Sequence, residues 1–310
     1  EISLGLVGSE MCIRDRFKIG PRINASGRIQ NGKEAVDLLT EKDFSVALEK
    51  AGQINQYNET RKDLDKTMTE EANQIVAGLE GLADRRSIVL YNEDWHKGVI
   101  GIVASRLTEV YYRPAVVLTR TDDMATGSAR SVSGFDVYKA IEYCRDLLEN
   151  FGGHMYAAGL TMRPENVGEF TRRFNAYVEE NIDPQMLVPQ VDIDSELLFS
   201  DITPAFRKDL NRFQPFGPGN TAPVFATCGV SNHGDAKLVG MECEHLRMDL
   251  MQRQKPNTKI QAIAFQQPTH YEWVRSGRPI DVCYQIVENH YRGTVTTQLR
   301  IKDIKPVLNR

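Results

Sequence analysis

FGGHMYAAG, residues 151–159, is the stretch that most clearly indicates an α/β protein with a ligand site. Paired glycines permit backbone dihedrals that other residues avoid, and they let the backbone approach a ligand closely. His154 follows at once, placed to bond a phosphate or a leaving oxygen. A single His is more often structural than catalytic, but ligands gather at loops that enter the strands of an α/β sheet. Gly152, Gly153 and His154 are therefore candidate site residues.

The residues around this stretch predict a mainly α/β domain over about 85–182. Short apolar runs indicate strands, and apolar residues on one face indicate helices. The predicted elements are a strand at 87–91, a helix at 99–111, strands at 114–118 and 124–130, a helix at 136–149, a strand at 157–161 and a helix at 165–180. Strands that alternate with helices are typical of α/β domains.

The motif GSARS, residues 127–131, ends one of the predicted strands. Arg130 stands between the hydroxyls of Ser128 and Ser131, which suits a phosphate clamp made of one charge and several hydrogen bonds. Ser-rich strand ends are also common turn chemistry, so the pattern alone is weak.

WHKGVIGIVASR, residues 95–106, opens a helix whose first turn carries two glycines. Exposed N–H groups at such a helix start can hold an anion. Packing of the helix on the sheet explains Gly101 and Ala104 better, while the roles of His96 and Lys97 stay open.

GPRINASGRI, residues 20–29, places two guanidiniums and an amide among residues that favour turns and helix starts. Arg forks onto phosphate oxygens, so Arg22, Asn24 and Arg28 are weaker candidates for substrate contact. The alternative is a loop whose arginines pair with surface carboxylates.

Two further regions flank the α/β domain. Residues 43–79 contain no Pro and show amphipathic spacing, which predicts one long helix between domains. After a Pro-rich segment, five short β-rich runs at 224–230, 246–251, 260–265, 280–287 and 294–301 predict a small β-barrel, with an OB-fold as the natural choice.

Composition sets limits on function. The 310 residues are 41% hydrophobic and 26% charged, with a net charge of −4. The net charge argues against a uniformly basic coat for nucleic acid but allows a local basic groove. Five scattered cysteines without a Cys-x-x-Cys pair indicate reduced, buried thiols rather than disulfides or zinc, as in a cytoplasmic protein. No run approaches the ~20 apolar residues of a membrane span.

In their order and spacing along the chain, these four motifs and the PFGPGN turn at 215–220 resemble the RecJ family of bacterial 5′-to-3′ single-strand exonucleases, in the DHH phosphoesterase superfamily. The resemblance runs from about residue 17 to the C-terminus. It implies a metal-binding DHH domain, a long connecting helix, a DHH-associated α/β domain that holds the DNA end, and an OB-fold domain that guides the strand. The implied divisions are an adapter-like leader (1–16), a DHH remnant (17–42), the connecting helix (43–84), the DHH-associated domain (85–182), a Pro-rich connector (183–222) and the OB-fold (223–310).

The resemblance also implies cofactors, partners and a location. The resemblance implies that a DHH domain holds Mn²⁺ or Mg²⁺ with Asp and His ligands and performs hydrolysis, but no Asp-His-His occurs in this sequence. We therefore expect no metal ligands here, an N-terminally truncated chain that is inactive alone, and His154 as the one possible catalytic residue. Single-stranded DNA is the expected partner, with a single-strand binding protein and a helicase as further ones, for a monomer in the bacterial cytoplasm.

Charge and aromatic content refine the binding prediction. Residues 190–310 carry 15 Lys and Arg against 13 Asp and Glu, which is no strong electrostatic funnel. Base stacking would then carry single-strand binding, although each aromatic could equally fill the barrel core. The candidates are Phe265, Tyr271, Trp273, Tyr284 and Tyr291. Two alternatives stay open: a non-catalytic single-strand-binding module, and a DHH-family phosphodiesterase for short oligonucleotides or cyclic dinucleotides, against which the OB-like segment argues.

Overall fold

The computed structural model describes residues 18–79, 81–82, 84–217, 219–252, 258–291 and 294–307, with only the backbone of His290 and Tyr291. The predicted leader at 1–16 lies outside these residues. The chain divides into two compact units, residues 1–189 and 190–310.

The first unit is built on a five-stranded sheet in the order β1-β2-β3-β5-β4. Its strands are β1 (Ile88–Tyr91), β2 (Ala115–Thr121), β3 (Met124–Arg130), β4 (Leu148–His154) and β5 (Ala157–Met162). Strands β1 and β2 are parallel, and the other neighbours are antiparallel. The mixed sheet confirms the predicted α/β character of this region.

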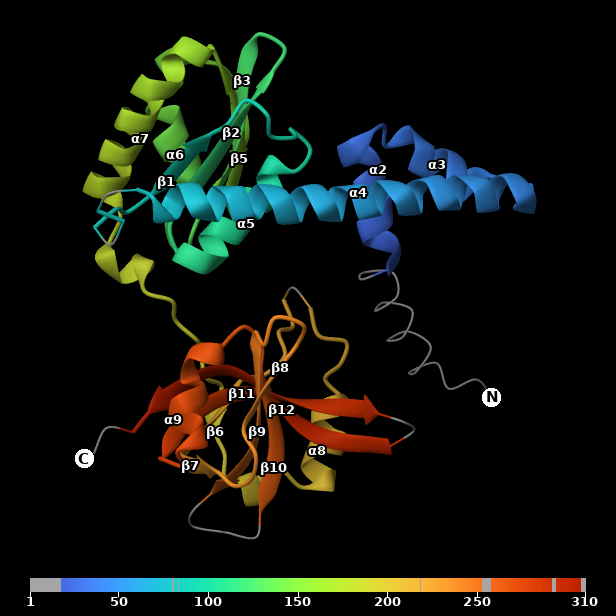
Figure 1. Cartoon of the computed structure of the whole chain (residues 1–310), viewed down its shortest axis with the longest axis vertical. Coiled ribbons are helices and arrows are strands. Elements are labelled where there is room, and N and C mark those ends of the chain that lie inside the picture. The colour runs from blue at the N-terminus through green and yellow to red at the C-terminus, as the bar shows by residue number, and fades with distance from the viewer. Residues whose placement is uncertain are drawn as a thin grey trace. The chain divides into compact units, whose positions relative to one another are not determined.

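Helices cover both faces of this sheet (Figure 1). The covering helices are α4 (Phe44–Ala77), α5 (Ile100–Tyr111), α6 (Val137–Glu142) and α7 (Val167–Asn181). Helices α2 (Gly20–Ile29) and α3 (Lys33–Thr40) pack on α4 instead. On one face α6 and α7 bury an apolar cluster that includes Phe170 and Phe174, both fully buried. On the other face α4 and α5 pack on β1 and β2 through side chains such as Val103, Leu107 and Met68.

The predicted long helix is present as α4, whose 34 residues span roughly 51 Å at 1.5 Å per residue. The Asp43 carboxylate caps its start by accepting hydrogen bonds from the Ser45 and Val46 N–H groups. Midway, the buried Asp65 carboxylate accepts two 2.7 Å hydrogen bonds from Arg106 of α5. This bidentate pair fixes the position of α5 on the long helix.

One predicted helix was wrong. The helix expected at 136–149 ends at Glu142, and Leu148 begins strand β4, which pairs along β5. The apolar spacing suited a helix, but pairing of β4 with β5 is a tertiary contact that overrides that local preference. Gly152 and Gly153 consequently lie within a strand instead of breaking the chain. The 20–29 motif likewise forms a helix, α2, rather than a loop.

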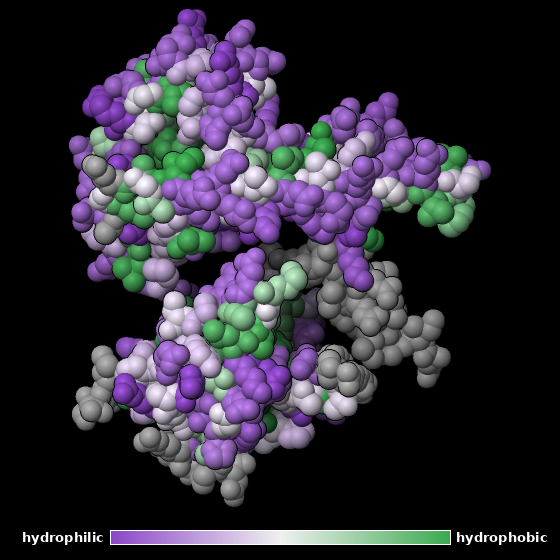
Figure 2. All heavy atoms as spheres, in the orientation of Figure 1, coloured by the Kyte–Doolittle hydropathy of each residue, from purple (hydrophilic) through white to green (hydrophobic). Residues whose placement is uncertain are grey.

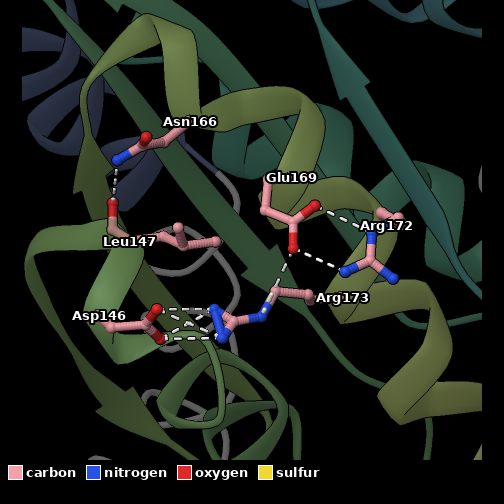
Figure 3. A network of polar contacts seen from close by, with 6 residues as sticks. All are labelled: Asp146, Leu147, Asn166, Glu169, Arg172 and Arg173. Atoms are coloured by element: carbon pink, nitrogen blue, oxygen red, sulfur yellow. Dashed lines mark hydrogen bonds and ion pairs between the residues drawn. The ribbon is translucent and has the colours of Figure 1, made fainter.

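Strand β4 is attached to α7 by a polar network at the surface (Figure 3). Arg173 forks onto the Asp146 carboxylate at 2.8–3.3 Å and also contacts Glu169. Asn166 donates a 2.9 Å hydrogen bond to the Leu147 carbonyl, directly before β4. Behind this network, burial raises the pKa of the Cys144 thiol to about 11.

Apolar side chains are exposed where α3 meets the start of α4 (Figure 2). Phe44 is 81% exposed, and Val36, Leu39 and Leu48 are also exposed. None of the described residues covers this apolar end of the unit.

The second unit contains a seven-stranded sheet in the order β6-β7-β11-β12-β10-β9-β8. Its strands are β6 (Ser195–Glu196), β7 (Phe225–Asn232), β8 (Lys237–Val239), β9 (His245–Gln252), β10 (Lys259–Ala264), β11 (Ile280–Tyr291) and β12 (Thr294–Pro306), and its helices are α8 (Pro204–Asn211) and α9 (Tyr271–Arg275). Because β7 also pairs with β9, the hydrogen-bonded path β7-β11-β12-β10-β9 returns to β7. All five predicted strands are present, whereas the two- and three-residue strands β6 and β8 were not predicted.

Residues buried inside this sheet form its own core. Tyr284 is fully buried, and its hydroxyl lies 2.7 Å from the Thr227 hydroxyl. Burial raises the pKa of Tyr284 to about 12. The expected burial of the thiols holds for Cys144 and Cys283, but Cys228 and Cys243 are exposed.

Candidate anion-binding site

The candidate site begins with alternation along β3. Thr126, Ser128 and Arg130 point to one face of the sheet, while Ala125 and Ala129 are buried on the other. Because successive side chains of a strand alternate, a period of two brings one hydroxyl and one guanidinium side by side. The Arg130 Nη1 group donates to Ser128 Oγ at 3.0 Å and to the Ala129 carbonyl at 2.7 Å.

The same face continues across β5 and β4 with small residues. Ser128 lies opposite Gly159, which lies opposite Gly152, and in the next row Arg130 faces Ala157 and then His154. Directly opposite residues of antiparallel strands share a face. The two rows therefore form an open floor, with Ser128 and Arg130 along one side and His154 on the far strand.

The start of α5 faces the β3 side of this floor. A Cβ added at Gly101 would lie 3.0 Å from Ser128 Oγ and 3.1 Å from Arg130 Nη2, so the glycine keeps this space open. Among the backbone hydrogen bonds of the described residues, none engages the Gly101 N–H. An N–H group at a helix start, beside the positive end of the helix dipole, favours a bound anion.

The end of α2 forms another wall. Arg28 Nη1 donates to the Gly98 carbonyl at 2.9 Å. A Cβ at Gly98 would lie 2.1 Å from the Arg28 carbonyl oxygen, so only glycine allows this close approach. His96 Nδ1 accepts a 3.1 Å hydrogen bond from the Gly98 N–H. The neutral His96 ring must then carry its proton on Nε2, which makes that nitrogen a donor.

These elements enclose a cavity of about 620 Å³, here named the anion cavity. Its lining residues are Gly27, Arg28, Ile29, His96, Lys97, Gly98, Ile100, Gly101, Thr126, Gly127, Ser128 and Arg130. None of these residues is an Asp or a Glu. The lining therefore supplies two guanidiniums, an ammonium and an imidazole without a compensating carboxylate.

Arg130 shows the electrostatic consequence. Burial lowers the pKa of this half-buried guanidinium, and the nearby positive charge of Arg28 lowers it further. Among the described residues no carboxylate forms an ion pair with either side chain. A bound anion would offset both the desolvation and the repulsion of the two arginines.

A second hollow of about 360 Å³ adjoins the anion cavity. The two share Lys97, Thr126 and Gly127. The second hollow adds Asn150, Phe151, Gly152, Gly159, Leu160 and Thr161. The floor thus leads from a cationic cavity to a neutral surface of hydroxyl, amide and glycine groups.

Only some of the site residues predicted from the sequence lie together in the structure. It brings Arg28, Ser128 and Arg130 together in the anion cavity and places Gly152 in the second hollow. His154 is exposed at the end of β4 and accepts a 3.2 Å hydrogen bond from the Tyr156 N–H. Gly153 is required by close packing, because a Cβ there would lie 2.3 Å from the Ala157 carbonyl oxygen.

Three other candidates lie outside both hollows. The Ser131 hydroxyl donates to the Phe135 carbonyl at 2.8 Å. Arg22 joins α2 to α4 through a 3.0 Å hydrogen bond to Asn55 Oδ1, and Asn24 is exposed on α2.

The sequence did not assign several residues that line these hollows. His96 and Lys97 were left open, and Thr126, Asn150 and Thr161 were not singled out. Thr126 could have been found, because it continues the period-two series of Ser128 and Arg130.

In the second unit, the aromatic candidates for base stacking differ in how far they are buried. Tyr284 is core, and Tyr271 and Trp273 are partly buried against that core. Phe265 is 43% exposed. The side chain of Tyr291 lies outside the described residues.

Comparison with known proteins agrees with the two-unit architecture. The DHHA1 domain family matches residues 84–180, and the RecJ OB domain family matches residues 193–303. Fold and site together define a DHH-associated domain followed by an OB domain.

Named relatives narrow this class. The single-stranded-DNA-specific exonuclease RecJ of Bacillus subtilis is 33% identical over 93% of this chain, and that of Haemophilus influenzae is 32% identical over 94%. The chain belongs to the RecJ family. It spans 36% and 51% of the length of these two relatives. The OB domain sets it apart from the short-oligonucleotide phosphodiesterase alternative.

Solved structures give the same result for the fold. The crystal structure of Thermus thermophilus RecJ in complex with Mn²⁺ matches with a TM-score of 0.79 and 25% identity, over 98% of this chain and 44% of that one. The Mg²⁺ complex matches with a TM-score of 0.78. Both of these RecJ structures therefore contain a divalent metal ion.

The described residues of this chain do not fit such a metal. No group of three or more His, Cys, Asp or Glu side chains among them could hold an ion. Within the same residues, no helix combines the length and apolar character needed to cross a membrane.

Proposed function

We propose that this chain holds the 5′ end of single-stranded DNA for a 5′-to-3′ exonuclease and guides the strand that follows. The terminal 5′-phosphate occupies the anion cavity, and the first nucleotides cross the floor formed by β3, β5 and β4. The observation that carries this proposal is the cationic lining of the cavity, which contains no carboxylate.

Each group has a role in this proposal. Arg130 and Arg28 provide charge and fork geometry, and Ser128, the Gly101 N–H and His96 Nε2 provide hydrogen bonds. Lys97 lies where the cavity meets the second hollow, so it serves the next phosphate. His154 lies on β4, at the far side of the floor. There it can contact the bound DNA strand, but not the terminal phosphate.

Glycines on the floor allow the nucleic acid to lie close to the sheet. Gly152 and Gly159 have open space where a Cβ would stand: nothing lies within 4 Å at Gly152, and only one backbone atom, at 3.9 Å, does at Gly159. A sugar–phosphate chain can therefore approach the backbone here without displacing side chains.

Hydrolysis is assigned elsewhere. The described residues form no metal site, and no Asp-His-His occurs in the sequence, so no hydrolytic step is derived for this chain. We expect 5′-phosphorylated single-stranded DNA with Mn²⁺ to remain intact in its presence. Robust turnover by the chain alone would contradict this part of the proposal. Contacts with a single-strand binding protein or a helicase, and a monomeric state, stay predictions.

The binding proposal is tested by comparing oligonucleotides that differ only at the 5′ end. The chain is expected to bind a 5′-phosphorylated oligothymidine more tightly than its 5′-hydroxyl twin in fluorescence anisotropy. Arg130→Met should remove most of this preference, since a hydrogen-bonded charge contributes about 1.5–3 kcal/mol. Arg163→Met, at an exposed arginine paired with Glu149, is the matched control and should keep the preference. Equal affinity of the unchanged chain for both oligonucleotides would overturn the proposal.

A further inference from the structure

The loop between β1 and α5 brings His96 and Lys97 into the lining of the anion cavity. It comprises residues 92–99 and is named the cavity loop. At its start, the Asn92 N–H donates to the Leu118 carbonyl of β2 at 3.2 Å. Side-chain donors select one small anion only if supporting contacts hold their backbone in place. The residues that hold the cavity loop therefore bear on what the cavity can recognise.

Thr119 of β2 contacts the cavity loop and is fully buried. Its hydroxyl donates to the Trp95 carbonyl at 2.6 Å and lies 3.3 Å from the Glu93 carbonyl. Ala115 and Val117 point to the same face of β2, because side chains alternate along a strand, and both belong to the apolar core. The hydroxyl at the third position of this row is therefore explained by the loop carbonyl and not by the core.

The Trp95 side chain provides a second anchor for the loop. It is 4% exposed and lies in the apolar cluster that α4 and α5 form on β1 and β2. Its Nε1–H donates to the Glu71 carboxylate of α4 at 2.8 Å. Trp95 is thus attached to the sheet through its carbonyl and to the long helix through its indole. Both bonds are inside a buried cluster, where a lost partner is costly.

A third contact lies at the other end of the cavity loop. Three residues after Trp95, the Gly98 carbonyl accepts the 2.9 Å hydrogen bond from Arg28 of α2. His96 and Lys97 therefore lie between two fixed points of the backbone. Helix α2 itself packs on α4, so the long helix supports both the cavity loop and the α2 wall that faces it.

We propose that Thr119 and Glu71 are positioning residues for recognition of the 5′-phosphate. They fix Trp95, and Trp95 in turn holds His96 and Lys97 against the first phosphates of the strand. Neither Thr119 nor Glu71 lines the anion cavity, so each acts through the loop and not by contact with the ligand. A loop displacement of ~1 Å is enough to take a donor out of hydrogen-bond range. The inference rests on the proposed function, since it takes the 5′-phosphate as the anion.

The test measures how much more tightly the full chain binds a 5′-phosphorylated oligothymidine than its 5′-hydroxyl twin. Thr119→Val replaces the hydroxyl by a methyl group of similar shape, and Thr119→Ser restores the donor. Thr227→Val is the matched control, because Thr227 is buried in the second unit and its hydroxyl donates to the Leu197 carbonyl at 2.8 Å. The control loses a comparable buried hydrogen bond away from the cavity loop.

A second pair of variants tests the other anchor without a change in the sheet. Glu71 is half-buried on α4, so its replacement should leave the unit folded. Glu71→Leu removes the acceptor for the Trp95 indole, and Glu71→Gln keeps one. A spectroscopic measurement follows the loop directly: Trp273→Phe leaves Trp95 as the only tryptophan of the sequence, and its emission shifts to longer wavelength if the loop moves toward water.

We expect Thr119→Val to reduce the preference for a 5′-phosphate about fivefold, and Glu71→Leu about threefold. Both should shift the Trp95 emission to longer wavelength. Thr119→Ser and Glu71→Gln should behave as the unchanged chain does, and Thr227→Val should alter neither readout.

Two results would overturn the positioning role and leave the anion cavity proposal standing. The first is an unaltered preference in Thr119→Val and Glu71→Leu. The second is an equal loss of preference in Thr227→Val, which would make the effect one of general stability. If the unchanged chain showed no preference for a 5′-phosphate, the proposed function would fail and this inference with it.

Discussion

The anion cavity of the first unit and the outward face of the second unit's sheet both present arginines that have no carboxylate partner among the described residues, but they do so in opposite ways. In the cavity, Arg130 is half-buried among backbone and hydroxyl groups, and two glycines set the space around it. On that face of the second sheet, Arg247 of β9 and Arg300 of β12 are exposed, and the Phe265 ring at the end of β10 lies between their strands. The first arrangement suits one anion of fixed shape, and the second suits any stretch of a flexible strand.

This difference indicates a division of labour. Recognition of a strand end requires rigid donors and a desolvated charge, because the end differs from the rest of the strand only by its terminal phosphate. Guidance of the strand requires contacts that tolerate every base and allow movement. We propose that the two demands are met in separate units of the chain, so variants in one should spare the function of the other.

The largest effect is expected from a single methyl group in strand β4. In Gly153→Ala the new Cβ would lie 2.3 Å from the Ala157 carbonyl oxygen and 2.5 Å from the Ala158 Cα, so β4 and β5 must separate. We expect a loss of about 2–3 kcal/mol in the free energy of unfolding, measured by urea denaturation. Gly152→Ala is the control, because nothing lies within 4 Å of its Cβ, and it should unfold normally. Equal stability of the two variants would contradict the close packing.

The next effect separates end recognition from strand binding. Gly101→Ala places a methyl group about as close as hydrogen-bonded atoms to Ser128 Oγ and Arg130 Nη2 and should reduce the preference for a 5′-phosphate about tenfold. Binding of a 5′-hydroxyl strand should not change. Gly168→Ala in α7, where a Cβ meets nothing within 4 Å, controls for the effect of alanine on helix stability. If Gly101→Ala kept the full preference, the phosphate would have to lie elsewhere.

A smaller effect is expected in the salt dependence of single-strand binding. Each lost phosphate contact lowers the slope of log affinity against log salt by about 0.7 for a single strand. Arg247→Met should show this decrease, whereas Phe265→Leu should weaken binding with an unchanged slope. Titrations at several salt concentrations measure both slopes. Identical slopes for Arg247→Met and the unchanged chain would mean that Arg247 makes no phosphate contact.

The smallest effect is expected from the polar network of Figure 3. Arg173→Met removes the contacts to Asp146 and Glu169, but the Asp146 side chain is 62% exposed. Exposed pairs contribute little, so the free energy of unfolding should fall by less than about 1 kcal/mol. The preference for a 5′-phosphate should persist. A loss of that preference would mean that this network determines the position of the strands that form the floor.

Much of this arrangement follows from local sequence, and the remainder depends on distant contacts. Alternation along β3 already pairs Ser128 with Arg130 and separates Ser131, although the sequence motif treats both serines alike. The sequence predicts a helix up to residue 149, whereas Leu148 already begins β4, because the register of β4 with β5 is not visible in its own apolar spacing.

The cavity itself is the part that sequence could not supply. Its shape depends on the contact between Arg28 and Gly98, which are 70 positions apart. Without that contact, nothing distinguishes His96 and Lys97 from a solvated loop. The resemblance in motif order predicted the class of protein, whereas the particular lining of the cavity required the fold.

The most direct measurement is a crystal structure of this chain with a 5′-phosphorylated oligothymidine. The account predicts the terminal phosphate in the anion cavity, within hydrogen-bond distance of Arg130, Ser128 and Arg28. An oligonucleotide bound only through the second unit, with its 5′-phosphate away from these three residues, would contradict it.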